Sequence, residues 1–125
     1  MTDGILFWWR KLVIIFLMII KQEKEIKKIV NQIVENYKPE KVILFGSFAY
    51  GKPKENSDVD LMVIKKTNNR FIRRLFRVVE GIDSDLGTDI LVYTPKEWAR
   101  RLKEGHYFFK EVAQRGRILY EKKSK

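Results

Sequence analysis

The hydrophobic pattern in the first third of the chain predicts an amphipathic helix. From residue 26 onward, apolar residues recur every three or four positions, and Lys and Glu fill most of the others. This spacing places the apolar side chains on one helical face. Proline cannot donate a backbone hydrogen bond, so Pro39 is expected to end the helix. The apolar positions are Ile26, Ile29, Val30, Ile33, Val34 and Tyr37.

Two short apolar runs predict strands. Residues 41–45 (KVILF) are closed by Gly46, and residues 88–93 (TDILVY) follow Gly87. Both runs are rich in β-branched and aromatic residues and have glycine at one end, which is typical of strands.

A turn-rich segment lies between these runs, and a further strand follows it. Residues 47–57 contain glycine, proline and asparagine and are expected to form a loop. In residues 58–64, apolar residues occupy every second position after Asp58. Successive strand side chains point to opposite faces, so Asp58 and Asp60 are expected to share one face of the sheet.

The segment 70–82 predicts another helix, because its apolar residues again follow helical spacing and Gly81 and Gly87 mark its exit. Its apolar positions are Phe71, Ile72, Leu75, Phe76, Val79 and Ile82. The arginines along it are Arg70, Arg73, Arg74 and Arg77. A solvated basic face is the simplest interpretation of these arginines, and binding of RNA or a protein partner is the alternative.

The C-terminal third predicts two helices and an edge strand. Residues 94–97 (TPKE) form a capping-box pattern with proline at the first helical position. Gly105 is expected to interrupt the helix that starts there, and Gly116 to end a second one before a strand at 117–120. Trp98, Phe108 and Phe109 are expected to lie in the core, and His106 to be partly buried in a structural role.

Together these elements predict an α/β (α+β) fold, a small mixed β-sheet flanked by helices that lie mostly on one face. A chain of 125 residues has room for a single core, which we assign to residues 21–125.

Residues 1–20 form an apolar N-terminal extension. The run 5–20 is interrupted by Arg10 and Lys11 and falls short of the roughly 20 apolar residues of a membrane span. No small-residue cleavage site follows it, so a signal peptide is not expected. Three interpretations stay open: a helix that binds a membrane surface or a partner, a helix packed on the domain, or a segment upstream of a natural start at Met18.

The net charge and the absence of cysteine indicate which partners and which cellular compartment to expect. The net charge is +10, which favours polyanions such as nucleotides, although the basic residues form no continuous block. Nucleic acid is a possible but not a required partner. The chain has no cysteine, which excludes disulfides and thiolate metal sites and allows a reducing, cytoplasmic location.

The chemistry is carried by Gly46, Ser47, Asp58, Asp60 and Asp89. A strand end followed by Gly-Ser allows a phosphate to approach the backbone closely, and serine adds a hydroxyl donor. Two aspartates separated by one strand residue can hold hard divalent cations with the substrate phosphates, and a later strand can add a third carboxylate. Carboxylates this close repel one another, which favours metal binding over a purely structural role.

The segment 46–64 (GSFAYGKPKENSDVDLMVI) resembles the signature of the polymerase-beta-like nucleotidyltransferase superfamily, Gly-Ser followed by Asp-x-Asp. Its ten-residue spacer is similar to that of the minimal nucleotidyltransferases, the antitoxin partners of HEPN-domain RNase toxins. The similarity runs from about Gln22 to Glu121 and includes TDILVY and GRILYEK.

The resemblance implies a nucleotidyltransferase fold and an Mg²⁺-dependent enzyme. Gly46 and Ser47 would bind the triphosphate, Asp58 and Asp60 would bind the magnesium ions, two of them, and Asp89 would be the third carboxylate. In this branch, AMP is transferred from ATP to a tyrosine of the toxin, which implies a hetero-oligomer. Two alternatives remain: transfer to a small-molecule hydroxyl such as that of an aminoglycoside, and a non-catalytic antitoxin that inhibits by binding.

Overall fold

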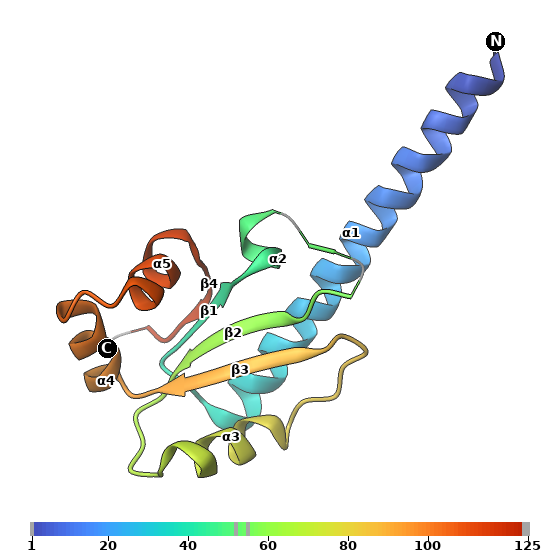
Figure 1. Ribbon diagram of the computed structural model, residues 1–125. Helices are drawn as coiled ribbons and strands as arrows, with labels where there is room; N and C mark the ends of the chain where they lie inside the picture. Colours follow the sequence, from blue (N-terminus) through green and yellow to red (C-terminus); the bar gives the residue numbers. More distant parts are fainter. Residues whose placement is uncertain (1, 52, 55, 124–125) are drawn as a thin grey trace.

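The computed structural model describes residues 2–51, 53–54 and 56–123 and contains a four-stranded sheet with the order β3-β2-β1-β4 (Figure 1). The strands are β1 (Lys41–Phe45), β2 (Val59–Ile64), β3 (Thr88–Tyr93) and β4 (Arg117–Glu121). Strand β1 pairs antiparallel with β2 and β4, whereas β2 pairs parallel with β3. The sheet is therefore mixed, as the sequence predicts, and β4 is an edge strand.

Helices cover both faces of this sheet. On one face, α1 (Thr2–Tyr37) and α3 (Phe71–Val79) pack on alternate strand residues such as Val42 and Leu61. On the other, Phe109 and Val112 of α5 (Tyr107–Arg115) pack on Ile43 and Met62. The expectation of helices mostly on one face is wrong, because β1 and β2 carry apolar residues at nearly every position and so bury both faces.

Helix α3 is rotated relative to the face that its sequence predicts. Its buried residues are Arg74 and Val78, whereas Ile72 and Phe76 are 64% and 66% exposed. The expectation that Arg74 lies on a solvated face is therefore wrong. A cluster of polar contacts around this arginine accounts for the rotation.

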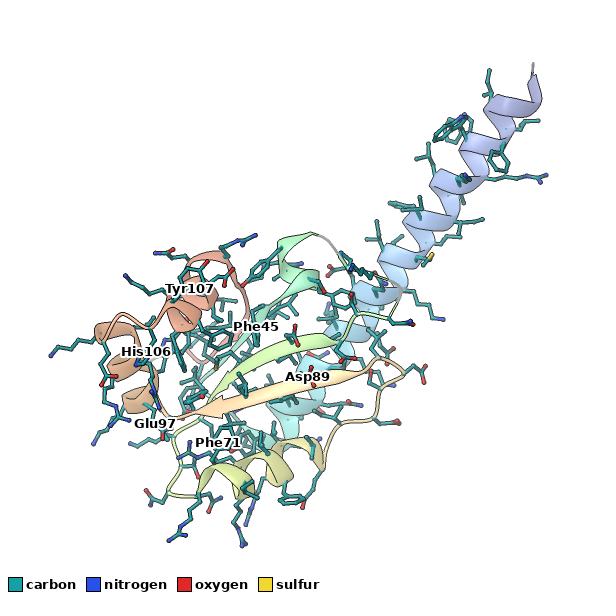
Figure 2. The ribbon with its side chains drawn as sticks, in the orientation of Figure 1. Phe45, Phe71, Asp89, Glu97, His106 and Tyr107 are labelled. Atoms are coloured by element: carbon teal, nitrogen blue, oxygen red, sulfur yellow. The ribbon has the colours of Figure 1, made fainter. Side chains whose placement is uncertain are left out.

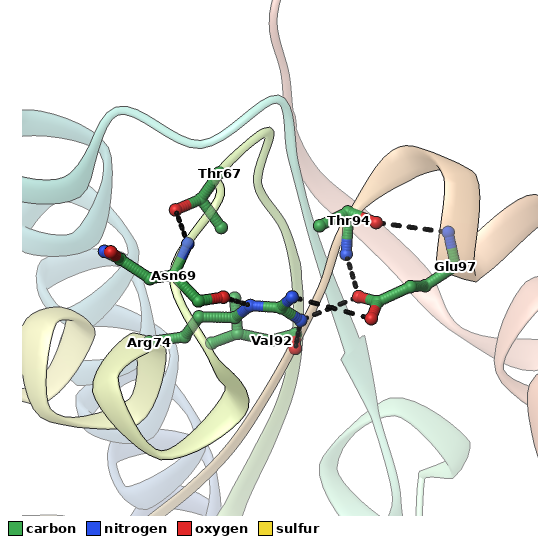
Figure 3. Close-up of polar contacts among 6 residues, drawn as sticks. All are labelled: Thr67, Asn69, Arg74, Val92, Thr94 and Glu97. Carbon is green, nitrogen blue, oxygen red and sulfur yellow. Dashed lines mark hydrogen bonds and ion pairs between the residues drawn. The ribbon is translucent and has the colours of Figure 1, made fainter.

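The Arg74 guanidinium ties α3 to the end of β3 and to the start of α4 (Pro95–Lys103), as Figure 3 shows. It donates hydrogen bonds to the backbone oxygen of Asn69 at 2.7 Å and to Glu97 Oε1 at 2.7 Å. Glu97 also accepts from the Thr94 backbone N–H, and the Thr94 hydroxyl accepts from the Glu97 N–H. The predicted capping box is confirmed, and its glutamate neutralises a buried arginine at the same time.

The C-terminal elements follow the predicted order. Helix α4 ends near Gly105, which has a positive φ of 76°, and α5 ends at Gly116 before β4. Phe109 is buried as expected, whereas Phe108 is 39% exposed. The side chain of His106 is exposed, with Nε2 3.0 Å from Glu104 Oε2, so the expectation of partial burial is wrong.

Residues 4–20 continue α1 as a straight arm that projects away from the sheet (Figure 1). Its side chains are exposed, and the buried part of α1 begins at Ile26. The interpretation of this segment as a helix packed on the domain is therefore wrong. Within the described part of the chain, no helix has the length and apolar character needed to cross a membrane.

Removing residues 1–17 is expected to leave the stability of the domain unchanged, because the described side chains of this segment make no buried core contacts. Thermal unfolding of the shortened chain should show a midpoint within about 2 °C of the full chain, corresponding to less than roughly 0.5 kcal/mol. A larger decrease would mean that the arm contributes to the folded domain.

Glu97→Gln is expected to destabilise the fold by about 2 kcal/mol at pH 7, because it leaves the buried Arg74 guanidinium without a counter-charge. Glutamine can still accept the Thr94 hydrogen bond, so the capping box is retained. Chemical denaturation measures the loss. The control is Glu104→Gln, whose partner Arg100 is exposed, and its effect should stay below about 0.5 kcal/mol.

The Arg74–Glu97 ion pair also predicts that the stability of the fold depends on pH. Burial opposes ionisation of Glu97, but hydrogen bonds from Arg74 and Thr94 outweigh it and hold the pKa below the ordinary 4.5. A depressed carboxyl pKa stabilises the fold above the unfolded-state pKa. The difference between wild type and Glu97→Gln should therefore be complete above about pH 5 and decline as the pH falls through the folded-state pKa.

Candidate active site

The segment after β1 forms a tight turn into a short helix, α2 (Ser47–Tyr50), where the sequence predicts a loop. The Gly46 oxygen accepts hydrogen bonds from the backbone N–H groups of Ala49 and Tyr50 at 3.1 and 3.0 Å. Gly46 and Gly51 flank the helix with φ values of 74° and 80°, a conformation that favours glycine. The loop expectation is thus wrong for residues 47–50. Positions 52 and 55 lie outside the described residues.

Gly46 is also required for clearance. It follows Phe45, whose register partner on β2 is Asp60. A β-carbon at Gly46 would overlap the carboxylate of Asp60. The carboxylate therefore lies directly against the backbone of the Gly-Ser turn, and the first two parts of the sequence motif are brought together.

Asp58 has a similar relation to Gly87. The N–H of Val59 donates to the Gly87 oxygen at 2.8 Å, which joins the starts of β2 and β3. A β-carbon at Gly87 would overlap the Asp58 carboxylate. Sequence reasoning treated Gly87 only as a boundary between a helix and a strand, because its contact with Asp58 depends on the pairing of β2 with β3.

The third carboxylate, Asp89, lies near the start of β3 (Figure 2). It is the register partner of Asp60 across the parallel β2–β3 pair. Residues that alternate with Asp60 and Asp89, such as Met62 and Leu91, pack on the face covered by α5. All three aspartates therefore converge at one corner of the sheet, next to Gly46 and Ser47.

The electrostatics of Asp60 reflect this convergence. Burial, followed by the charges of Asp89 and Asp58, raises the pKa of the Asp60 carboxyl above its ordinary value. A side-chain hydrogen bond to Asp89 adds a smaller contribution to the same rise in the pKa of Asp60. Asp58 and Asp89 are exposed, whereas Asp60 is half-buried. A cation that reached this corner would relieve the repulsion directly.

The donor set suits a hard cation, because carboxylate oxygens are the ligands that Mg²⁺ prefers. Among the described residues, no three His, Asp or Glu side chains form an arrangement that could hold a metal ion by themselves. Mg²⁺ is commonly bound by one or two carboxylates together with substrate phosphates. The residues present fit a site of that kind, in which the substrate supplies part of the ligand shell.

A broad hollow of about 840 Å³ lies along α3 and is lined by arginines and exposed apolar residues. It is lined by none of the candidate residues. The converging carboxylates, rather than this hollow, identify the candidate active site.

Comparison with known proteins agrees with this geometry. Residues 24–125 match the family described as "Polymerase beta, Nucleotidyltransferase". The chain belongs to this family. It is a nucleotidyltransferase, and the matched region contains Gly46, Ser47 and all three aspartates and excludes the arm.

The relatives of this nucleotidyltransferase include proteins of Methanocaldococcus jannaschii. "Putative protein adenylyltransferase MJ0604" is 27% identical over 106 residues, which cover 79% of this chain and 98% of the relative. "Putative protein adenylyltransferase MJ1379" is 32% identical over 81 residues, which cover 61% of this chain and 81% of the relative.

A solved structure supports the fold. The crystal structure of a "putative nucleotidyltransferase from Sulfolobus solfataricus" aligns with a TM-score of 0.61 at 22% identity. The alignment covers 83% of this chain and 84% of that one. The expectation of a nucleotidyltransferase fold built on a small mixed sheet is confirmed.

Gly46→Ala is expected to lower nucleotidyl transfer by about a hundredfold, because the new β-carbon displaces the Asp60 carboxylate and misplaced catalytic groups cost about that much. Gly51→Ala is the matched control. Its φ is also positive, but a β-carbon there has open space around it. Gly51→Ala should lose about 1 kcal/mol of stability from the left-handed backbone. Gly46→Ala should lose more, because φ 74° with ψ −159° is open essentially only to glycine and the β-carbon also meets Asp60, so activities are compared per amount of folded protein. Equal activities of the two would contradict the steric role of Gly46.

Proposed function

We infer that this nucleotidyltransferase is a cytoplasmic, Mg²⁺-dependent protein adenylyltransferase that moves AMP from ATP to a tyrosine hydroxyl. We further infer that the acceptor belongs to a HEPN-type RNase toxin and that the chain acts as its antitoxin within a hetero-oligomer. The observation that carries the chemistry is the convergence of Asp58, Asp60 and Asp89 beside the Gly46 turn.

Two observations support a protein acceptor. The M. jannaschii relatives are named as putative protein adenylyltransferases, and the alignment to one of them covers 98% of its length. The HEPN toxin as acceptor rests on the resemblance of the ten-residue spacer between Ser47 and Asp58 to that of the minimal nucleotidyltransferases.

The candidate residues have separate roles in binding the triphosphate and the metal ion. Gly46 presents its backbone to the triphosphate, because it carries no side chain that would exclude a phosphate, and Ser47 adds a hydroxyl donor. Asp58 and Asp60 would hold Mg²⁺, which when bound neutralises the carboxylates and polarises the phosphate oxygens. The absence of a side chain at Gly87 leaves room for Asp58.

Asp89 would accept the proton of the incoming hydroxyl, and its register position beside Asp60 and its exposure to solvent support this role. The hydroxyl oxygen attacks the α-phosphorus of ATP and forms a new P–O bond. The bond between the α-phosphorus and the bridging oxygen breaks, and pyrophosphate leaves. An in-line displacement of this kind depends mainly on positioning and charge stabilisation.

The test is transfer of label from α-labelled ATP, with Mg²⁺, to a co-purified partner protein. Wild type should label a tyrosine of the partner, and Asp58→Asn with Asp60→Asn should abolish labelling. Labelling by the double variant would contradict the metal assignment. If neither protein labels the partner but wild type labels an aminoglycoside, the acceptor is a small molecule. Inhibition of the partner that the double variant retains without labelling indicates an antitoxin that acts by binding alone.

The same double variant should be at least as stable as wild type when divalent cations are removed. A raised carboxyl pKa means that the ionised Asp60 destabilises the fold at neutral pH, and asparagine removes that charge. Thermal unfolding in EDTA and in Mg²⁺ measures this. Mg²⁺ should raise the midpoint of wild type and leave that of the variant unchanged. A double variant that is strongly destabilised in EDTA would contradict the repulsion.

A further inference from the structure

The end of α5 lies next to the turn that Gly46 and Ser47 form after β1. Arg117 on β4 is the register partner of Leu44, the strand residue two positions before Gly46. A β-carbon at Gly116 would meet the Leu44 backbone oxygen and the Ile43 side chain, so the chain passes closely over β1 here. Arg115, the last residue of α5, therefore lies close to the end of β1, where the Gly46–Ser47 turn begins.

Arg115 stacks on a residue of α2. Its guanidinium carbon lies 4.0 Å from the centre of the Tyr50 ring, and its Nη1 lies 3.1 Å from Glu111 Oε1. Tyr50 closes the short helix that Gly46 and Ser47 open, and its backbone N–H binds the Gly46 oxygen. The Tyr50 ring thus supports the Arg115 guanidinium at the end of the short helix that starts from the turn.

The pKa of the Tyr50 hydroxyl reflects groups on α5 and on the sheet. Burial raises the pKa of Tyr50, the Gly46 backbone and Arg115 oppose the rise, and Glu111 and Asp60 add to it. The stacking of Arg115 on Tyr50, which lies four residues after Gly46, and the contact of Gly46 with Asp60 place the arginine on the same corner of the molecule as the aspartates. Sequence reasoning assigned no role to either residue.

We propose that Arg115, positioned by the Tyr50 ring, binds the terminal phosphates of the nucleoside triphosphate. This inference rests on the proposed function and deepens it, since it assigns recognition of the triphosphate, as opposed to a monophosphate, to two further residues. Tyr50 is a positioning residue, and Arg115 is the phosphate ligand.

The physical case follows from charge and geometry. A triphosphate beside three aspartates concentrates negative charge, and the Gly-Ser turn offers dipoles but no full positive charge. A guanidinium matches phosphate oxygens with a planar pair of donors, and an aromatic face holds it in orientation without competing for those donors.

Arg115 pairs with Glu111, and a phosphate can replace Glu111 as its partner. The side chains of Arg115 and Glu111 are 57% and 26% exposed and lie one helical turn apart, so their pairing is weak. Charge-assisted bonds to a triphosphate are stronger than such a pair. Arg115 can therefore exchange Glu111 for phosphate without any change in the fold.

Equilibrium binding of α,β-methylene-ATP and of AMP to the full chain, both in Mg²⁺, tests the proposal without interference from catalysis. Arg115→Ala should weaken binding of the triphosphate analogue about tenfold, the loss typical of a charged hydrogen bond, and change AMP binding less than about twofold. Arg115→Lys should recover part of the loss, because it retains charge but not the planar donors. Tyr50→Phe should bind like wild type, and Tyr50→Leu should bind more weakly.

The matched control is Arg117→Ala, which removes the same charge two residues away from a side chain that pairs with Glu23. It should bind both nucleotides like wild type. Equal affinities of the Arg115→Ala and Arg117→Ala variants for the analogue would overturn the proposal, as would an equal loss of AMP binding. If wild type transfers AMP while Arg115→Ala keeps full triphosphate affinity, only this inference fails. If wild type binds no nucleotide, the proposed function fails with it.

Discussion

The register of the parallel pair β2–β3 is the constraint on which the active site depends. It sets Asp60 opposite Asp89, and the two-residue period of a strand keeps both on one face with Asp58 just before β2. Three like charges at one point destabilise a fold, yet two of these side chains are exposed at the sheet corner. Water weakens their repulsion there, so the fold can hold the cluster without a bound cation.

The opposite end of the same strand pair is held by charges of opposite sign. Arg74 reaches from α3 to the backbone oxygen of Val92 and to Glu97, beyond the last residue of β3. Strand β3 therefore has a neutralised ionic contact at one end and uncompensated carboxylates at the other. The crossover through α3, which a parallel pair requires, is fixed at the end away from the chemistry.

The sequence predicted most of the sheet and the common face of Asp58 and Asp60, because both depend on local patterns. Alternation in β2 placed Asp58 and Asp60 on one face, and the capping box located α4 from four residues. The buried face of α3 was not predictable in this way. It depends on Arg74 meeting Glu97, 23 residues later, and helical periodicity treats any arginine as solvent-facing. Gly87, Tyr50 and Arg115 were missed for a related reason, since their roles arise only when separate elements meet.

The N-terminal arm has a consequence for orientation. No glycine or proline interrupts residues 5–37, so α1 is one stiff rod whose base is embedded in the core at Ile29 and Ile33. The seventeen residues of the arm, 4–20, at about 1.5 Å each, extend the helix axis by about 26 Å beyond the domain. A contact that held the N-terminal end of the arm would therefore fix the orientation of the whole sheet. It would also set the direction in which Asp58, Asp60 and Asp89 face.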